Sequence, residues 1–155
     1  MRKPKIYLET TVFNHYFDTN REAHIATVKL FKEMWRYEAY TSAYVIEELE
    51  EAQEPKRSDM LGLISKYGIK VLEVEDEAER LAEIYVNEGV IPAKFTYDGL
   101  HIAIATINDL EYIFSLNFKH INKLKTKIMT GVINLREGYR QITIANPMEV
   151  VEDDE

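Results

Sequence analysis

Short apolar runs alternate with longer amphipathic stretches along the chain. Runs with the length and composition of buried strands predict five strands, at residues 5–9, 38–42, 69–74, 112–116 and 142–145. Longer stretches, with apolar residues at helical spacing, predict six helices, at residues 22–36, 43–54, 58–66, 76–88, 97–109 and 119–130. Strands separated by helices favour right-handed crossovers and a parallel sheet. The expected fold class is therefore α/β, with three layers (α/β/α) around a central, Rossmann-like parallel sheet of about four to five strands.

This arrangement indicates where a functional site belongs. Ligands of parallel α/β sheets bind beyond the carboxyl ends of the strands, where the strand order reverses. Polar residues stand at the ends of three predicted strands: Glu9 to Thr11, Ser42, and Ser115 to Asn117. We expect a site at this edge of the sheet.

The predicted helix 43–54 gives two adjacent glutamates opposite environments. One face is entirely acidic and must be solvated; it carries Glu47, Glu50, Glu51 and Glu54. The buried stripe is marked by Val45, Leu49 and Ala52, and Glu48 falls on that stripe. Glu47 is therefore expected at the surface and Glu48 inside. A carboxylate that faces inward is costly unless it is paired or binds a cation.

Two other acids allow more than one explanation. Glu9 could be a ligand, a helix cap or a solvated side chain, but glutamate is a poor N-cap and Thr10 or Thr11 is the better capping candidate. Asp98 opens a helix that is apolar nearly all round, where the helix dipole alone favours an acid. His101 shares the face of Asp98 and is more typical of a hydrogen-bonded core histidine than of a metal ligand.

Together these residues predict a cation site. The candidates are three inward acids and three neutral polar residues: Glu9, Glu48, Asp98, Thr11, Ser115 and Asn117. Hard oxygen ligands without clusters of histidine or cysteine suit Mg²⁺ or Mn²⁺. Without a cation, three close carboxylates would repel one another and raise one another's pKa.

Composition narrows the class of protein. The 155 residues, 46% hydrophobic and 30% charged, are expected to form a single domain over residues 1–151, with a disordered acidic tail at 152–155. The chain has no cysteine, no apolar run long enough to span a membrane and no signal peptide, so a cytoplasmic protein is expected. Its six glycines form no phosphate-binding motif, which argues against a nucleotide-binding fold.

The distribution of charge is uneven. A net charge of −8 argues against unfocused binding to nucleic acid. Residues 112–136 nevertheless contain no acid, and their basic side chains are Lys119, Lys123, Lys125, Lys127 and Arg136. This basic strip could contact a polyanion. An ordinary solvated helix face would produce the same pattern.

Four segments, in order along residues 6–121, resemble the PIN-domain family and especially the VapC-type toxin ribonucleases of prokaryotes. They are IYLETTVF, TSAYVIEEL, YDGLHIAIA and FSLNFKHI. The resemblance implies that Glu9, Glu48 and Asp98 bind the metal, with Thr11 supporting the first acid and Asn117 at the fourth catalytic position. Many relatives carry aspartate where Glu9 and Asn117 stand. The glutamate keeps the charge, whereas the asparagine loses one and makes a second tightly held metal less expected.

The resemblance implies a metal-dependent endoribonuclease that hydrolyses RNA phosphodiester bonds as the toxin of a type II toxin–antitoxin system, with Mg²⁺ or Mn²⁺ as cofactor. Lys119, His120 and Lys123 would contact the RNA. Tyr97 or Phe118 could stack on a base, although Phe118 is also typical of core packing. A homodimer and an antitoxin partner are implied as well.

Two other functions compete with this one. A non-catalytic PIN-like module that binds RNA or a protein is the alternative, and the amide at the fourth catalytic position is its best support. A phosphoacceptor domain is poorly matched, because the first strand is not followed by adjacent acids.

Overall fold

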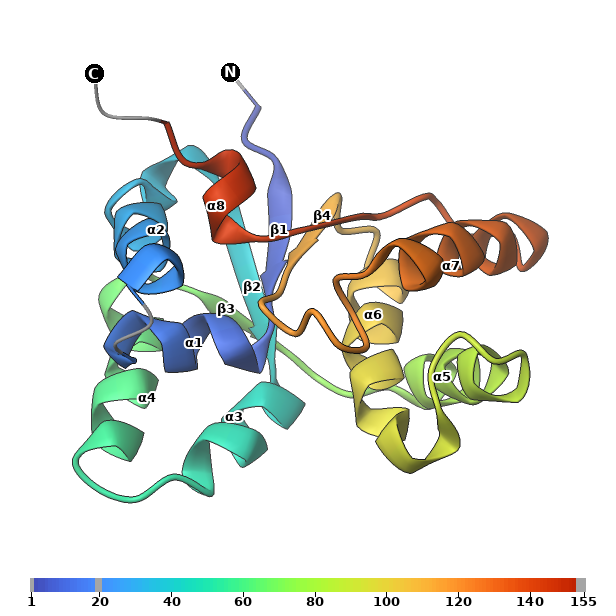
Figure 1. Ribbon diagram of the computed structural model, residues 1–155, viewed down its shortest axis with the longest axis horizontal. Coiled ribbons are helices and arrows are strands. Elements are labelled where there is room, and N and C mark those ends of the chain that lie inside the picture. The colour runs from blue at the N-terminus through green and yellow to red at the C-terminus, as the bar shows by residue number, and fades with distance from the viewer. Residues whose placement is uncertain (1, 19–20, 153–155) are drawn as a thin grey trace.

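The computed structural model describes residues 2–18 and 21–152, and its centre is a five-stranded parallel sheet. The strands lie in the order β3-β2-β1-β4-β5. Their bounds are Lys5–Leu8 for β1, Glu38–Ser42 for β2, Lys70–Leu72 for β3, Tyr112–Phe114 for β4 and Thr143–Ala145 for β5. The predicted α/β class is confirmed (Figure 1).

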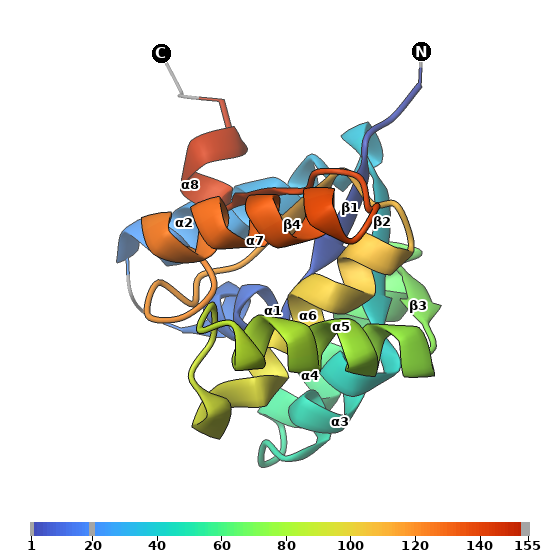
Figure 2. The same ribbon diagram turned by 90° about the vertical axis from the view of Figure 1, so that its right-hand side faces the viewer.

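Helices cover both sides of the sheet (Figure 1). One side carries α1 (Thr10–Phe17), α2 (Arg21–Lys32), α3 (Ala43–Glu50), α4 (Lys56–Lys66) and α8 (Pro147–Val150). The other side carries α5 (Asp76–Asn87), α6 (Thr96–Ile107) and α7 (Leu124–Arg136). Figure 2 shows α5 and α7 as the outer helices of this side. Two short 3-10 helices, η1 (Met34–Arg36) and η2 (Ala93–Phe95), precede β2 and α6.

The strand order reverses between β1 and β4. From β1 the chain steps outward to β2 and β3, and then crosses through α5 and α6 to the other side of β1, where β4 and β5 follow. Leu8, the last residue of β1, aligns with Phe114, the last residue of β4. A reversal of this kind leaves a crevice beyond the carboxyl ends of the two strands. Residues that follow Leu8 and Phe114 therefore stand where a ligand would bind.

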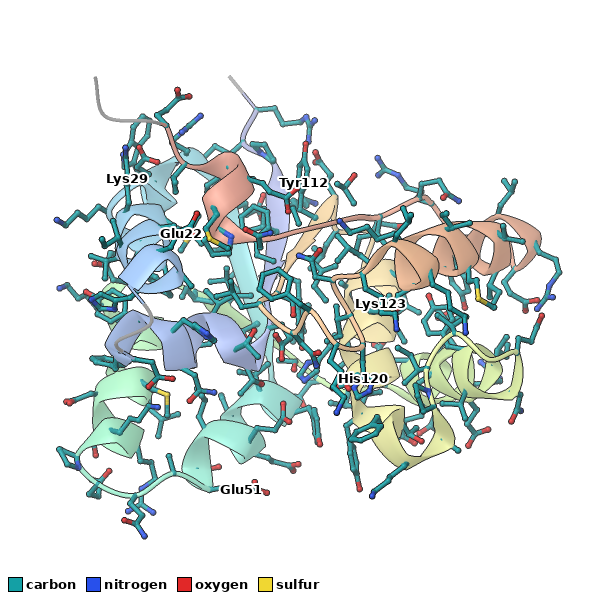
Figure 3. All side chains as sticks on the ribbon, viewed as in Figure 1. Glu22, Lys29, Glu51, Tyr112, His120 and Lys123 are labelled. Carbon is teal, nitrogen blue, oxygen red and sulfur yellow. The ribbon has the colours of Figure 1, made fainter. Side chains whose placement is uncertain are left out.

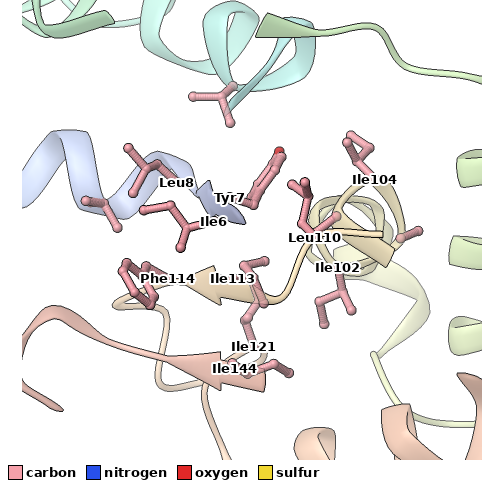
Figure 4. Close-up of a cluster of buried hydrophobic side chains, with 14 of the residues drawn as sticks. Ile6, Tyr7, Leu8, Ile102, Ile104, Leu110, Ile113, Phe114, Ile121 and Ile144 are labelled. Atoms are coloured by element: carbon pink, nitrogen blue, oxygen red, sulfur yellow. The ribbon is translucent and has the colours of Figure 1, made fainter. Parts of the chain in front are cut away.

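The two strands beside this crevice are anchored in the core. Ile6, Tyr7 and Leu8 of β1 are fully buried, as are Ile113 and Phe114 of β4. Figure 4 shows the apolar cluster that these side chains form with residues of α6 and β5. Full burial of one such side chain stabilises the fold by about 1.5–3 kcal/mol. The core therefore fixes the two strand ends from which the crevice is built.

The prediction of a helix at residues 119–130 is wrong for its first residues. Residues 118–123 form turns and bends, and α7 begins only at Leu124. The cause is Asn117, whose backbone carbonyl accepts hydrogen bonds from the N–H groups of Ile121 and Asn122. The Asn117 side chain also accepts from the N–H of His120. These bonds close the chain into a loop, so the first basic residues of the strip precede the helix.

Other element bounds also differ from the sequence pattern, which does not predict α1 or α8. Because α1 begins at Thr10, the predicted strand 5–9 is one residue too long. The predicted helix 43–54 ends at Glu50, so Ala52 lies beyond it, and the predicted helix 22–36 is α2 followed by η1. The predicted tail at 152–155 lies outside the described residues except for residue 152. Over the described ranges, every helix is too short or too polar to cross a membrane.

Candidate active site

Three acids approach the crevice from different elements. Glu9 directly follows β1, Glu48 lies on α3, and Asp98 lies in the first turn of α6. Figure 1 shows α3 and the beginnings of α1 and α6 below the end of β1. The charges of all three carboxylates act on the buried His101 ring. The structure therefore brings together the acids that the sequence selects.

Glu9 is a buried carboxylate held by hydroxyl groups. Only 3% of its surface is exposed. Its Oε1 accepts hydrogen bonds from Thr11 Oγ1 and from Ser115 Oγ, the latter at 2.7 Å. Thr11 Oγ1 in turn accepts from the backbone N–H of Leu116 at 2.7 Å, so one hydroxyl links the end of β1 to the loop after β4. The predicted position of Thr11 beside the first acid is confirmed.

The predicted capping role of the threonines is wrong. The N-cap of α1 is Glu9, and its side chain makes no capping hydrogen bond. The hydroxyl of Thr10 donates to Glu48 Oε1 at 2.5 Å and that of Thr11 donates to Glu9. Both threonine hydroxyls therefore bind carboxylates of the site instead of the helix backbone.

Glu48 points toward the interior, as predicted, while Glu47 is exposed. The Glu48 side chain keeps 30% of its surface, and its Oε1 accepts from Thr10 and from His101 Nε2 at 2.7 Å. A carboxylate only accepts hydrogen bonds, so Nε2 of His101 is the protonated nitrogen of this pair. The inward acid of α3 is therefore paired, as a buried carboxylate must be.

A chain of hydrogen bonds extends from Glu48 into the core. His101 Nδ1 shares a hydrogen bond with Tyr7 Oη at 2.8 Å, and the same hydroxyl is 2.8 Å from Ser42 Oγ. Ser42 is the N-cap of α3 and accepts from the N–H of Val45 at 3.2 Å. The chain connects β1, β2, α3 and α6 through fully buried side chains. It fixes the orientation of the His101 ring and, through it, that of Glu48.

Asp98 is paired with a second histidine. Its Oδ2 accepts from His120 Nδ1 at 3.0 Å, with 19% of the Asp98 side chain and 11% of the His120 side chain exposed. The His120 ring also packs on Phe95, with ring centroids 4.1 Å apart. His120 was predicted from the resemblance as an RNA contact, but its ring is occupied by Asp98 and Phe95. We therefore regard it as a residue that orients Asp98.

Asn117 lies in the loop after β4, where its hydrogen bonds stay within the loop. Its Oδ1 accepts from the backbone N–H of His120 at 3.0 Å, and its own N–H donates to Ser115 Oγ at 3.0 Å. The amide oxygen is thus used to close the loop. Asn117 shapes the loop that carries His120.

The carboxylates of the site differ in their pKa. Burial raises the pKa of Glu9, and the opposing effects of His101 and the hydroxyls only partly offset it. Burial also acts to raise the pKa of Glu48, but the hydrogen bond and charge of His101 outweigh it and the pKa falls below its ordinary value. Burial acts to lower the pKa of His101, but the hydrogen bond that its Nε2 donates to Glu48 and the nearby negative charges raise it overall. Glu48 and His101 therefore favour the ionised pair, whereas ionised Glu9 is costly.

The carboxylate oxygens of the site are ligands of the kind that hard cations prefer. Within the described residues, Glu48 Oε2 and Asp98 Oδ1 have no hydrogen-bond partner, while the other oxygen of each carboxylate is held by the protein. Over the same residues, no group of three or more acidic, histidine or cysteine side chains is close enough to enclose a metal ion. Mg²⁺ keeps several waters and is commonly held by one or two carboxylates. The residues therefore fit a hydrated ion bound through few direct ligands.

Basic and aromatic side chains surround the acids. Lys119 and Lys123 are exposed on the loop after β4, and Figure 3 shows Lys123 near His120. Phe118 has 49% of its surface exposed, so its predicted core packing is wrong: the loop turns it outward. Tyr97 is 59% exposed, directly before Asp98.

The hydrogen-bonding roles of Tyr7 and Thr10 are not indicated by the sequence, and His101 has a larger role than its position there suggests. Tyr7 reads as an ordinary core residue, and its hydroxyl partners lie 35 and 94 residues away along the chain. His101 did carry a signal, since it stands one helical turn after Asp98 on a buried face. A buried histidine beside an acid calls for a hydrogen-bond partner. Here that partner is the acid of another helix.

Comparison with known proteins identifies the fold. No family model and no curated protein sequence matches the chain. The crystal structure of VapC20 from Mycobacterium tuberculosis, a Sarcin-Ricin loop cleaving toxin, is similar with a TM-score of 0.56 at 12% identity, over 74% of this chain and 92% of VapC20. A toxin–antitoxin complex from Klebsiella pneumoniae gives a TM-score of 0.56 at 16% identity, over 77% of this chain and 92% of the matched chain.

A third structure extends over more of the chain. VapBC2 from Rickettsia felis, bound to a DNA fragment from their promoter, gives a TM-score of 0.57 at 9% identity, over 92% of this chain and 98% of the matched chain. At such low identities the likeness shows the fold. The chain therefore has the PIN-like fold of VapC toxins, as its four motifs predict.

Proposed function

We propose that this chain is a metal-dependent endoribonuclease and the toxin of a type II toxin–antitoxin pair. The observation that carries the proposal is the gathering of Glu9, Glu48 and Asp98 at the reversal of strand order. Each acid is oriented by its own hydrogen-bond donors. The shared fold of VapC toxins adds support, because one of them is a Sarcin-Ricin loop cleaving toxin and another forms a toxin–antitoxin complex.

In this mechanism the three carboxylates would hold a hydrated Mg²⁺ or Mn²⁺, in part through its bound waters, and the ion would supply Lewis-acid stabilisation of charge on the phosphate. The protein contributes by fixing the direction of each carboxylate before substrate arrives. Thr11 and Ser115 hold Glu9. His101 and His120 hold Glu48 and Asp98. A site of preoriented groups loses little free energy to reorganisation during the reaction.

RNA would approach over the loop after β4. Lys119 and Lys123 are exposed there, within a stretch of 25 residues that carries no acid. Lysine contacts to phosphates position the substrate but read no sequence. The acids repel the RNA backbone, so these lysines would supply much of the binding energy on an otherwise acidic protein.

The expected partners are an antitoxin, RNA and a second copy of the chain, in the cytoplasm. An antitoxin partner is supported by the complexes among the similar structures. A homodimer is supported by α7, where the exposed apolar side chains are Leu124, Ile128, Val132 and Leu135. They recur at i, i+4, i+8 and i+11 and so form one stripe along the helix. Sedimentation of the purified protein tests the dimer.

The decisive experiment measures RNA cleavage by purified protein with and without Mg²⁺ or Mn²⁺, alongside Asp98→Asn. We expect cleavage only with the metal, and its loss in Asp98→Asn, since the amide has no charge to attract a cation. Asp59→Asn on the exposed surface of α4 is the matched control and should cleave at the wild-type rate. Equal cleavage by wild type and Asp98→Asn would exclude the proposed site.

The alternative is a non-catalytic module of the same fold that binds RNA or a protein. It is favoured by one observation, that the fourth catalytic position carries the amide of Asn117, whose oxygen is engaged by the loop. This alternative predicts RNA binding without cleavage under any metal condition. The cleavage assay therefore distinguishes the two functions directly.

A further inference from the structure

Two stacked tyrosines form a column at the edge of the acidic site. The rings of Tyr44 and Tyr97 lie nearly parallel, 14° apart, with their centroids separated by 5.5 Å. The Tyr44 ring also packs at 51° against His101, with centroids 5.3 Å apart. Tyr97 is 59% exposed, Tyr44 is partly buried and His101 is buried. The aromatic column Tyr97–Tyr44–His101 therefore runs from solvent to the histidine that holds Glu48.

The column stands beside two of the three acids. Tyr97 immediately precedes Asp98 on α6, and Tyr44 lies one helical turn before Glu48 on α3. The outermost ring rests on a partner that fixes its plane, while more than half of its surface stays in solvent. A single exposed aromatic ring is common at a protein surface, so what distinguishes Tyr97 is its stacking on Tyr44 next to Asp98. Here the ring is held in place and left open.

Charge around the column favours a neutral ligand group over a phosphate. Glu47, Glu48 and Glu51 all lie within electrostatic reach of the Tyr44 hydroxyl. The exposed lysines Lys119 and Lys123 belong to the loop after β4, which carries the other side of the site. A nucleotide strand that crosses the acids would keep its phosphates toward the lysines. At the tyrosine side it would present a base, whose flat face is apolar and uncharged.

We propose that Tyr97, supported from behind by Tyr44, is the stacking platform for an unpaired base of the RNA substrate, next to the phosphate that enters the acidic site. This inference rests on the proposed ribonuclease function and adds its substrate class. A base can lie on an aromatic ring only when it is released from a duplex. The preferred substrate is therefore a single-stranded segment or loop, held by lysine contacts on one side and by stacking on the other.

The test measures binding of a fluorescently labelled single-stranded 12-nucleotide RNA in buffer without divalent metal, over a range of NaCl concentrations. Loss of one base–aromatic stack weakens binding roughly 5- to 150-fold, and we expect a loss in that range for Tyr97→Ala. Tyr97→Phe and Tyr97→Trp keep a ring and should bind within about twofold of wild type. Because stacking involves no phosphate, the slope of log affinity against log salt should be unchanged in Tyr97→Ala.

Two controls separate stacking from charge and from general damage. Lys123→Ala removes a charge and should reduce the salt slope by about 0.7, the value for one phosphate contact on a single strand. Trp35→Ala removes an equally exposed aromatic ring, 71% exposed, from η1 at the opposite end of the sheet, and should bind RNA like wild type. A duplex of the same sequence should bind wild type and Tyr97→Ala equally well.

Wild-type affinity in Tyr97→Ala would overturn the proposal, as would a loss that Tyr97→Phe shares. Unchanged RNA binding together with weaker binding of a protein partner would assign the tyrosines to that partner and refute base stacking. The proposed nuclease function is tested separately, by the cleavage assay with Asp98→Asn, in which Tyr97 is unchanged. RNA that binds through Tyr97 but is never cleaved would leave the platform standing and exclude the nuclease.

Discussion

Removal of one hydroxyl, in Thr11→Val, tests whether the loop after β4 is fastened to β1 through the site. Valine keeps the shape of threonine, so the change removes hydrogen bonds with little loss of packing. Thr11 Oγ1 accepts from the N–H of Leu116 at 2.7 Å and donates to Glu9 Oε1. The valine variant leaves the Leu116 N–H without its partner and takes one of two hydroxyl donors from the Glu9 carboxylate.

The size of the effect follows from these two bonds. A buried donor left unpaired costs about 1–3 kcal/mol, and a hydrogen bond to a charged group contributes about 1.5–3 kcal/mol. Thr11 is half-buried, so water replaces part of both losses. We expect the free energy of unfolding to fall by about 2–4 kcal/mol. For a chain of this length each kcal/mol lowers Tm by about 2–4 °C, which gives a decrease of roughly 5–15 °C.

Urea and thermal unfolding followed by circular dichroism measure this loss. Thr27→Val is the matched control, because Thr27 is fully buried and its hydroxyl donates only to a carbonyl of its own helix, at Ala23. That variant should lose no more than about 1 kcal/mol. Thr11→Ser retains the hydroxyl and should stay near wild type. If Thr11→Val is no less stable than Thr27→Val, the hydroxyl does not fasten the loop and the reasoning fails.

Three further predictions concern the core, the buried acid and a helix end. Ile102→Ala in the core of α6 should lower the free energy of unfolding by about 2–5 kcal/mol, whereas Ile25→Ala, 61% exposed on α2, should change it by less than about 0.5 kcal/mol in urea unfolding. Glu9→Gln should raise Tm at neutral pH without metal, because burial raises the pKa of Glu9 and its ionised form is costly in the fold. A carboxyl group with a raised pKa costs stability only where it is ionised, so the gain in Tm should vanish below about pH 4. A gain in Tm that persists below that pH would contradict this explanation. Gly138→Ala should lower the free energy of unfolding by about 1–2 kcal/mol in urea unfolding. Gly138 follows the C-cap of α7 with a φ of 83°, a backbone conformation that disfavours a side chain.

The local sequence was sufficient to predict the structure where a helix directly follows a strand. The predicted strand 38–42 is confirmed with both bounds, and Ser42, its last residue, caps the helix that follows. A run of strand-forming residues ends at a serine whose hydroxyl accepts from the N–H of Val45. Both signals lie within a few residues, so propensity and capping agree without help from the rest of the fold.

The sequence pattern failed at α1 because tertiary packing overrides propensity there. The helix opens with Thr10, Thr11 and Val12, β-branched residues that favour a strand. Val12 and Phe13 are fully buried, so the turn is stabilised by the core against which it packs. The strand therefore ends at Leu8, one residue before the predicted end at Glu9. The same turn directs the two threonine hydroxyls toward the acids.

The candidate site was predictable in its acids and unpredictable in the groups that hold them. A strand end selects Glu9, inward periodicity selects Glu48, and the start of a buried helix selects Asp98, all without structural information. Their partners come from distant segments: Ser115 reaches Glu9 across 106 residues and His101 reaches Glu48 across 53. Contacts of that separation leave no local pattern, because only the order of strands in the sheet decides which loops meet.

The way each acid is held also distinguishes the three carboxylates from one another. Glu48 and Asp98 each accept a hydrogen bond from a histidine ring, whereas Glu9, among the described residues, accepts from the neutral hydroxyls of Thr11 and Ser115 and from the backbone of Thr11. Glu9 is also the most buried of the three, so its charge is the least compensated by protein and water. Glu9 is therefore the acid of the site whose negative charge the fold tolerates least.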